Sequence, residues 1–306
     1  MKKDLITIED MSRREILSLM KLAGKLKKAP LSKKRMFKDK TLALLFQKPS
    51  NRTRISFEVA MVQLGGYVLY LSPREIAMGK RETAKDVGCV LSRYVDGMVA
   101  RVFSHTDVEE LARYSDVPVI NGLSDLAHPC QALSDLFTIL EKKKTLKNVT
   151  LSYVGDGNNV FNSLLMVCAK TGLDIKAAIP EGYDPDKSIL EKAEALAKES
   201  KSRVEIFRDP HDAVSGSDVV YTDVWTSMGQ EEEKEKRLRD FSGFQVNEQL
   251  MKSAPDGALI MHCLPAHRGE EITDVIDGKN SIVYDQAENR MHVQKAILLR
   301  LLADQD

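Results

Sequence analysis

Cysteine is scarce in this sequence, with four in 306 residues, and none of them forms a C-x-x-C pair. Such scattered cysteines indicate reduced thiols, because a disulfide framework or a zinc site needs closer and more regular spacing. A long hydrophobic run is missing as well, since no uncharged span approaches the roughly 18 residues of a membrane helix. The charged N-terminal segment also lacks the apolar region of a signal peptide. We therefore expect a cytoplasmic protein with no membrane association.

The sequence has no net charge, because 45 lysines and arginines balance 45 aspartates and glutamates. A neutral chain has no overall field that attracts nucleic acid or an anionic membrane surface. Nucleic acid is therefore not an expected partner. Any cluster of cations must act locally.

The length favours two domains, because 306 residues exceed what one hydrophobic core usually holds. Short β-rich runs alternate with helical segments along the whole chain, which is the pattern of a parallel sheet. The runs cover residues 41–46, 67–72, 97–103 and 117–121, then 149–156, 174–180, 203–209, 218–225, 258–265 and 281–288. The sequence therefore predicts an α/β fold with two domains, each a mainly parallel sheet with flanking helices.

Long helices are predicted to link the two domains. One covers about residues 129–144 and ends in a lysine cluster, and another, RMHVQKAILLRLLAD, lies at the end of the chain. We expect a first domain of residues 1–146 and a second of residues 147–287. The C-terminal helix, at about 288–306, is expected to pack back on the first domain.

A shorter helix is predicted over RISFEVAMVQLGG, residues 54–66. Ile55, Val59 and Val62 recur at helical spacing. Gly65 and its glycine neighbour are a typical stop signal at the C-terminus of a helix.

Cations gather just before this helix, in the segment KPSNRTRISFE at residues 48–58. The segment connects a predicted strand to a predicted helix, whose free N–H groups and positive dipole end favour a phosphate. Ser50 and Thr53 add hydroxyl groups, and Arg52 and Arg54 add guanidinium groups that match phosphate oxygens. The segment lacks the glycines and the G-K-[ST] of a Walker loop, so a nucleoside triphosphate is not the expected ligand. The alternative is a basic turn that only contacts solvent.

Three further polar clusters follow β-rich runs. GLSDLAHPCQALSD places His128 and Gln131 at the start of a helix, and TDVWTSMGQEEE places Asp223 and Ser227 at a strand end and in the loop after it. IMHCLPAHRGEE places Cys263 at the end of a buried strand. Each cluster alone is weak evidence of a site, because single polar residues at such positions are usually caps or surface groups.

Taken together and in this order, the motifs resemble those of the ornithine carbamoyltransferases, a branch of the aspartate/ornithine carbamoyltransferase family. The resemblance covers essentially the whole chain and rests on KPSNRTR, MVAR, HPCQ, GDGNN, DVWTSMG, HCLPAHRGEE and DQAENR. HPCQ together with HCLP is far more specific than any single motif, and the SMG loop separates this branch from the aspartate carbamoyltransferases. The resemblance implies transfer of the carbamoyl group from carbamoyl phosphate to the side-chain amine of L-ornithine. The products are L-citrulline and phosphate, and the reaction needs no metal and no organic cofactor.

The resemblance also implies which residues contact the substrates, with Arg101, His128 and Cys263 in catalytic roles. The expected carbamoyl phosphate contacts are Ser50, Asn51, Arg52, Thr53, Arg101, His128, Gln131, Cys263, Leu264 and Arg290. The expected ornithine contacts are Asn159, Asp223, Ser227 and Met228. The family further implies a homotrimer that can assemble further and a role in arginine biosynthesis.

Two positions depart from the family pattern. The family often has threonine where this chain has Asn51, which keeps a polar donor. At Ala77 the family commonly has glutamine or histidine, which reaches the carbamoyl phosphate of a neighbouring subunit in its trimers. Alanine cannot make this contact. Either Arg74 or Lys80 replaces it, or the shared contact is weaker in this protein.

The expected substrate contacts lie on two domains, which predicts an order of binding. Carbamoyl phosphate, held mainly by the first domain, is expected to bind first and to draw the domains together. The loop of Ser227, Met228 and Gly229 is then expected to close over the amino acid.

Other activities are alternatives. The nearest are carbamoyl transfer to putrescine, lysine or an acylated ornithine. A nicotinamide-dependent dehydrogenase would use YVGDGNNV as its phosphate loop, but Val160 replaces the third glycine of G-x-G-x-x-G and the basic segment would have no role. A non-catalytic sensor of small anions would need the basic segment but not Asp223 or the SMG loop.

Overall fold

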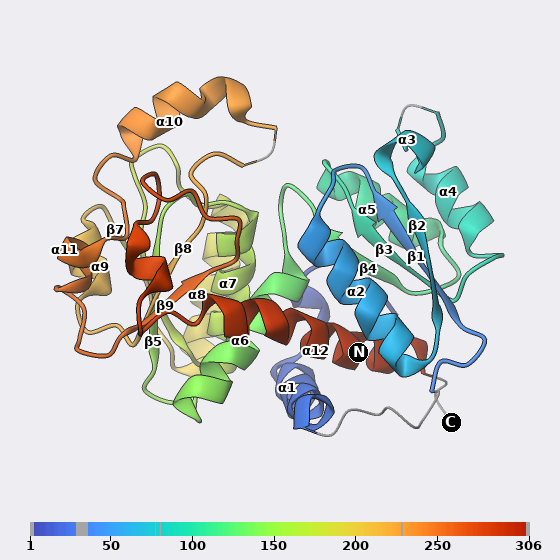
Figure 1. The fold of residues 1–306 in the computed structure, drawn as a ribbon, viewed down its shortest axis with the longest axis horizontal. Coiled ribbons are helices and arrows are strands. Elements are labelled where there is room, and N and C mark those ends of the chain that lie inside the picture. Colours follow the sequence, from blue (N-terminus) through green and yellow to red (C-terminus); the bar gives the residue numbers. More distant parts are fainter. Residues whose placement is uncertain (1–2, 29–35, 77, 80, 228, 304–306) are drawn as a thin grey trace. The chain divides into compact units, whose positions relative to one another are not determined.

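The computed structural model describes residues 3–28, 36–76, 78–79, 81–227 and 229–303. The chain forms two compact units, the first made of residues 1–137 and 288–306, the second of residues 138–287. The division falls inside two long helices, α6 (Pro129–Lys143) and α12 (Val283–Leu302). Each unit contains one parallel sheet with flanking helices (Figure 1), so the predicted fold class is confirmed. Ala77, Lys80 and Met228 lie outside the described residues.

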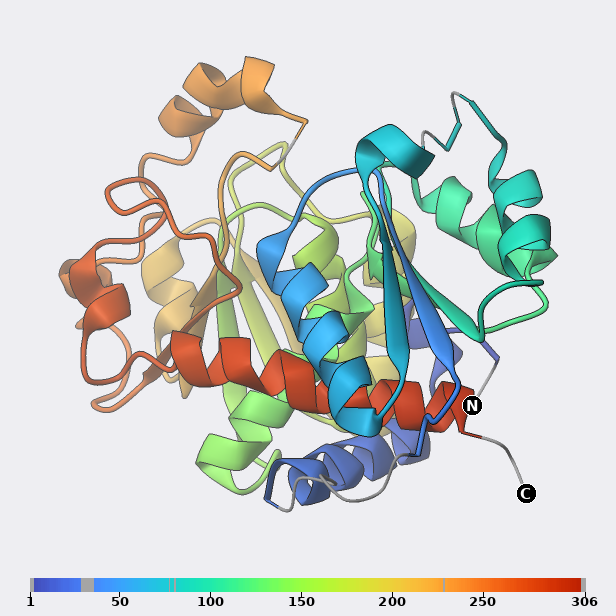
Figure 2. The same ribbon diagram turned by 45° about the vertical axis from the view of Figure 1, so that its right-hand side comes forward.

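Unit 1 is built on a four-stranded parallel sheet in the order β2-β1-β3-β4. Its α2 lies on one face of the sheet, and α4 and α5 lie on the other (Figure 2). Buried residues of β1, β3, α4 and α5 form one apolar core. The strands are β1 (Thr41–Phe46), β2 (Tyr67–Leu71), β3 (Gly97–Arg101) and β4 (Val119–Leu123), and the helices that complete the unit are α1 (Arg13–Lys28), α2 (Asn51–Leu64), α3 (Pro73–Ile76), α4 (Ala84–Leu91) and α5 (His105–Tyr114).

Unit 2 is built on a five-stranded parallel sheet in the order β7-β6-β5-β8-β9. In Figure 1, α7 and α8 lie on one side of this sheet, and α9 and α11 lie on the other. The strands are β5 (Thr150–Val154), β6 (Asp174–Ala178), β7 (Val204–Phe207), β8 (Val219–Thr222) and β9 (Leu259–His262). The helices are α7 (Asn159–Thr171), α8 (Lys187–Ser200), α9 (Pro210–Val214), α10 (Lys234–Asp240) and α11 (Glu248–Met251).

The prediction of a β-rich run at residues 281–288 is wrong. Ser281 forms one isolated bridge with Ile260, and α12 begins two residues later at Val283. Only Ile282 and Val283 are β-branched in this run, and the Asp-Gln-Ala-Glu that follows favours a helix. The C-terminal helix is consequently longer at its start than its apolar pattern suggests.

Helix α2 ends at Gly65, as predicted. The aliphatic residues that recur at helical spacing along it, however, do not lie in the core. Ile55, Val59 and Val62 are 56%, 36% and 64% exposed. The opposite face packs inward through the larger Phe57, together with Ala60, Met61 and Leu64. Gly65 ends the helix with a left-handed φ of 92°, a conformation that glycine adopts without strain.

Among the described residues, none of the helices combines the length and the apolar character that spanning a membrane requires.

Candidate active site

The strand order of unit 1 predicts a ligand site beyond the carboxyl ends of its strands β1 and β3. The chain leaves β1 towards β2 on one side, whereas β3 pairs with β1 on the other side. Ligands bind beyond the carboxyl ends of two strands that diverge in this way. Phe46 at the end of β1 pairs with Arg101 at the end of β3. Arg101 and the basic segment that follows β1 therefore lie at the same end of the sheet, beyond the carboxyl ends of the strands.

The basic segment is held in place by a capped helix. Ser50 caps α2, and its Oγ accepts a hydrogen bond from the backbone N–H of Thr53 at 3.3 Å. The Ser50 hydroxyl in turn donates to Thr53 Oγ1 at 3.1 Å. Arg290 on α12 donates from Nη2 to the same Thr53 Oγ1 at 2.8 Å. Four of the predicted carbamoyl phosphate contacts, Ser50, Asn51, Thr53 and Arg290, thus lie at the start of one helix.

His128 lies close to several of the cationic side chains of unit 1. It precedes α6 and is buried. Burial, followed by the charges of Arg290, Arg101, Arg52 and Lys48, holds its pKa well below the ordinary histidine value. The imidazole is therefore neutral at physiological pH. A neutral ring surrounded by four cations can donate one N–H to a ligand oxygen without adding charge.

Arg52 has an unmet hydrogen-bonding capacity at this site. Its Nε is buried and forms no hydrogen bond with any described residue. Burying a charged donor without an acceptor is costly, so such a group indicates a ligand or a bound water. Gln131, in the first turn of α6, donates from its amide to Asp135 at 2.8 Å, which fixes the orientation of the side chain.

Arg54 does not join this cluster. Its Nε donates to Glu58 at 2.8 Å, and its guanidinium lies 3.8 Å from the ring centre of Tyr70. The expected carbamoyl phosphate contacts likewise include Arg52 but not Arg54. Residues two apart on a helix point about 200° apart, so Arg52 and Arg54 cannot face the same ligand.

Lys48 is a member of the cluster that the sequence-based list of contacts omits. It is 7% exposed, and its ammonium lies 4.7 Å from the ring centre of Phe103. Burial and the nearby Arg101 lower its pKa to about 8, although Asp125 opposes the shift. Lys48 therefore loses its charge in a pH range where an exposed lysine keeps it.

We expect the affinity for carbamoyl phosphate to fall as the pH rises from 8 to 9.5. The phosphate remains a dianion over this range, but Lys48 becomes neutral, and a charged contact contributes about 1.5–3 kcal/mol. Calorimetric titrations at several pH values measure the effect. The Lys48→Met variant should bind more weakly and show a flat profile. An equally steep profile in this variant would assign the pH dependence to another group.

The linked effect on stability has a definite sign. The pKa of Lys48 is lower in the folded chain than the ordinary lysine value of 10.5. The unfolded chain therefore binds more protons between pH 8 and 10.5, and folding stability gains from Lys48 as the pH rises through this window. Below pH 8 the buried charge of Lys48 opposes folding.

Unit 2 has a corresponding edge at the ends of β5 and β8. The chain leaves β5 towards β6, and β8 pairs with β5 on the other side. Asp223 directly follows β8, and its carboxylate is held from three directions. Asn158 donates to Oδ2 at 3.0 Å, while the Cys263 thiol and the backbone N–H of Val224 donate to Oδ1 at 2.9 and 2.8 Å. Asp223 and Cys263, predicted from separate motifs, are thus in direct contact.

Asn158 is the neighbour of Asp223 in the structure, and it directly precedes Asn159, the predicted ornithine contact. Asn158 caps α7, accepting from the N–H groups of Val160 and Phe161, while its amide faces Asp223. Asn159 is the first residue of the helix. The two asparagines are adjacent in GDGNN, and no sequence signal distinguishes the cap from the residue after it. Ser227 donates its backbone N–H to Gln230 at 3.0 Å.

A buried histidine and carboxylate hold the end of β9. The backbone N–H of Leu264 donates to His262 Nδ1 at 2.8 Å, so the other ring nitrogen, Nε2, carries the proton and donates to Glu271 at 3.1 Å. Leu264 has a left-handed φ of 60°, which is strained for a leucine. The contact with His262 therefore fixes the backbone at Cys263 and Leu264. Neither His262 nor Glu271 is among the predicted site residues.

Arg237 connects the loops around Asp223. Its Nη1 donates to Asp156 at 2.8 Å and to the backbone oxygen of Trp225 at 3.0 Å. Asp156 is in the loop after β5, and Trp225 is two residues beyond Asp223. Burial raises the pKa of Asp156 to about 6, although Arg237 opposes this rise. The ion pair ties the Asn158 loop to the Ser227 loop.

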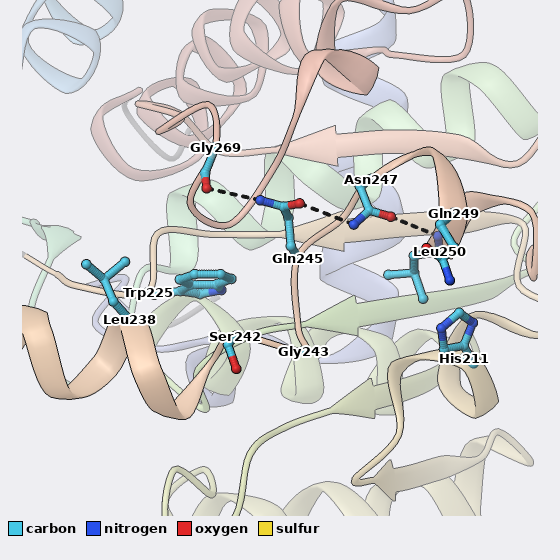
Figure 3. A pocket seen from close by; sticks show the side chains of 10 residues that line it. All are labelled: His211, Trp225, Leu238, Ser242, Gly243, Gln245, Asn247, Gln249, Leu250 and Gly269. Atoms are coloured by element: carbon cyan, nitrogen blue, oxygen red, sulfur yellow. Dashed lines mark hydrogen bonds between the residues drawn. The ribbon is translucent and has the colours of Figure 1, made fainter.

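A cavity of about 420 Å³ in unit 2 lies apart from the predicted contacts (Figure 3). Gln245 and Asn247 on its wall are bonded within the protein, Gln245 to Gly269 at 3.1 Å and Asn247 to Gln245 at 3.2 Å. Among the described residues, none of the predicted substrate contacts lines it. The cavity therefore carries no assignment to either substrate.

Comparison with known families agrees with these motifs. The carbamoyl-P binding domain of the aspartate/ornithine carbamoyltransferases matches residues 3–141, and the Asp/Orn binding domain of the same family matches residues 147–301. The ornithine carbamoyltransferase of Pyrococcus horikoshii is 54% identical over 303 residues, 98% of this chain and 96% of that protein. The anabolic ornithine carbamoyltransferase of Pyrococcus furiosus is 54% identical over 299 residues, 97% of this chain and 95% of that protein.

Solved structures show the same relationship. The ornithine carbamoyltransferase structure from Pyrococcus furiosus superposes with a TM-score of 0.95 at 52% identity, over 99% of this chain and 98% of that one. The corresponding structure from Thermus thermophilus gives a TM-score of 0.90 at 46% identity and covers 99% of both chains. The chain belongs to the ornithine carbamoyltransferases of the aspartate/ornithine carbamoyltransferase family.

Proposed function

We propose that this protein transfers the carbamoyl group of carbamoyl phosphate to the side-chain amine of L-ornithine, giving L-citrulline and phosphate. Family membership supports the reaction class. The observation that carries the proposal is the cation cluster around His128, in which the buried Nε of Arg52 has no acceptor among the described residues. A small dianion would supply the acceptor that the Nε of Arg52 lacks among the described residues.

Carbamoyl phosphate would bind at the start of α2. Ser50, Asn51, Arg52, Thr53 and Lys48 would hold the phosphate. Arg101 would reach the carbonyl oxygen, and the remaining expected contacts of the carbamoyl group are His128, Gln131 and Arg290, with the backbone oxygens of Cys263 and Leu264 accepting from its amide. Residues 1–146 with the C-terminal helix would form the carbamoyl phosphate domain, and residues 147–287 the ornithine domain.

The chemistry is an acyl transfer. The neutral amine of ornithine attacks the carbamoyl carbon, negative charge develops on the carbonyl oxygen, the C–O bond to phosphate breaks and the amine loses a proton. Arg101 and the neutral His128 would stabilise the developing charge. No oxidation state changes in this transfer, so it needs no redox cofactor, and the family resemblance implies neither a metal nor an organic cofactor.

Ornithine would bind at the end of β8. Asp223 would pair with the α-ammonium, and Asn158, Asn159 and the loop of Ser227 and Met228 would bind the α-carboxylate. The Cys263 thiol donates a hydrogen bond to Asp223, so the thiol is protonated in this arrangement and is not itself the base. The amine has a pKa of about 10.4 in solution, so the site must bind or generate its minor neutral form.

We further propose that the protein is a cytoplasmic homotrimer that acts in arginine biosynthesis. Ile55, Val59 and Val62 on α2, and Tyr67 and Leu69 on the edge strand β2, are exposed apolar residues that a second copy can cover. A relative whose name includes the word anabolic supports the biosynthetic direction. A monomeric mass in light scattering would contradict the trimer.

An acceptor panel tests the reaction. The protein is incubated with carbamoyl phosphate and with ornithine, putrescine, lysine or acetylated ornithine, and the ureido product is measured by colorimetry. We expect product with ornithine at a far higher kcat/KM than with the other amines. A higher value with another amine would reassign the acceptor, and the absence of any product would favour a sensor of small anions.

We expect norvaline, which lacks the reacting amine, to bind at least about tenfold more tightly when carbamoyl phosphate is present. The backbone of Cys263 is an expected carbamoyl contact, and its thiol is bonded to Asp223, so the first substrate organises the second site. Calorimetry with and without carbamoyl phosphate measures the difference. Equal norvaline affinities in the two titrations would rule out ordered binding.

A further inference from the structure

Glu271 is a buried carboxylate with one oxygen unaccounted for. Its side chain is fully buried, and Oε1 accepts from His262 Nε2 at 3.1 Å and from the backbone N–H of His267. Oε2 is buried and forms no hydrogen bond with any of the described residues. A buried carboxylate oxygen with no donor is rare, and it usually indicates a bound water or ion.

Two further ligand atoms face this oxygen. His267 Nδ1 lies 3.7 Å from Glu271 Oε2 and 3.8 Å from Glu270 Oε2. Both distances are too long for a hydrogen bond. Ligands around a tetrahedral ion with bonds of about 2.1 Å are about 3.4 Å apart, so the His267 nitrogen needs to move only slightly closer to each oxygen to share an ion with it. All three ligand atoms lie within 4.8 Å of one another.

The charges and exposure also suit a cation. Glu270 and Glu271 bring two negative charges, and Lys234 offsets part of them through a contact with the other oxygen of Glu270 at 2.8 Å. His267 is about half exposed, so solvent can reach the group and supply the remaining ligands. One imidazole nitrogen with two carboxylate oxygens is a donor set for Zn²⁺, Co²⁺ or Mn²⁺.

A second group, Asp223, His262 and Cys263, is less suited to an ion in this arrangement. Both ring nitrogens of His262 are engaged, Nδ1 with Leu264 and Nε2 with Glu271. The Cys263 thiol donates to Asp223. The side chains of this group are hydrogen-bonded to the protein, whereas the group at His267 includes Glu271 Oε2, which forms no hydrogen bond with the described residues.

We propose that His267, Glu270 and Glu271 form a binding site for a divalent transition-metal ion of the zinc class. The site is separate from the predicted substrate contacts, and its occupation does not depend on the proposed carbamoyl transfer. An ion there holds Glu271 by the oxygen that His262 does not use. It therefore steadies the carboxylate that fixes the end of β9.

Cobalt provides the test because its spectrum reports its ligands. The full-length protein is stripped of metal with a chelator and titrated with Co²⁺. We expect one ion per chain with weak visible bands and no intense near-ultraviolet band from a thiolate, because the ligands are nitrogen and oxygen. His267→Ala and Glu270→Gln should each weaken Co²⁺ binding by at least about tenfold. Lys234→Met should strengthen it, because it removes a competing cation.

His211→Ala is the matched control, since His211 is an exposed histidine of the same unit outside this group. It should leave Co²⁺ binding unchanged. The proposal is wrong if the wild-type chain binds no Co²⁺, or if binding survives in both His267→Ala and Glu270→Gln. A thiolate band that disappears in Cys263→Ser would place the ion at Cys263 and would equally overturn it.

Discussion

Replacing Arg52 with alanine is expected to lower kcat/KM for carbamoyl phosphate by a factor of about 100 to 1,000. The buried Nε of Arg52 has no acceptor within the described chain, and a phosphate oxygen would provide one. A charged contact contributes about 1.5–3 kcal/mol to binding, and its effect on rate is larger if it strengthens as the phosphate leaves. Initial rates of citrulline formation at saturating ornithine measure the loss.

Arg54→Ala is the control for this variant. Arg54 is the same residue type two positions away, but it pairs with Glu58 and stacks on Tyr70. We expect its kcat/KM to stay within about threefold of the original, because exposed ion pairs contribute little. Comparable losses in the two variants would mean that Arg52 acts through the fold of α2 and not through the ligand.

The second large effect is expected at Asp223. Asp223→Asn should raise KM for ornithine about 100-fold, because the amide cannot neutralise the α-ammonium of the substrate. It also loses an acceptor, since one amide oxygen replaces two carboxylate oxygens that bind Asn158, Val224 and Cys263. Steady-state kinetics with ornithine varied, together with calorimetry of carbamoyl phosphate, separate the two substrates.

Asp184→Asn is a suitable comparison, because Asp184 forms a surface ion pair with Arg208 in the same unit. Its KM for ornithine should not change measurably. If Asp223→Asn weakened carbamoyl phosphate binding as much as ornithine binding, its role would be structural and the assignment to the ammonium would be wrong.

The sequence predicts the strands of this fold well because buried parallel strands leave a strong signal. TLALLF is an uninterrupted apolar run and forms β1 with the predicted bounds, Thr41–Phe46. The run at residues 281–288 fails because a pair of β-branched residues is too short to outweigh the helix formers after it. A long apolar run is therefore enough to predict a strand, whereas a pair of β-branched residues is not.

Without the family resemblance, local pattern alone predicts a contact only where one motif contains both partners. Ser50 and Thr53 are three residues apart, and their hydrogen bond follows from a capped helix. The contact between Cys263 and Asp223 joins residues 40 positions apart, and only the pairing of β8 with β9 reveals it. Lys48 belongs to the basic segment but not to the expected contacts, because its lowered pKa depends on burial, which its sequence neighbours do not show.

The bond between Arg290 and Thr53 joins residues 237 positions apart. Both residues belong to unit 1, but Thr53 precedes unit 2 in the chain and Arg290 follows it. A growing chain on the ribosome therefore carries the β1–α2 turn for most of its synthesis without the arginine that braces it. Residues 138–287, by contrast, are continuous and can begin to fold as soon as they emerge. Anion recognition by this enzyme consequently depends on a residue that is synthesised only after the whole of residues 138–287.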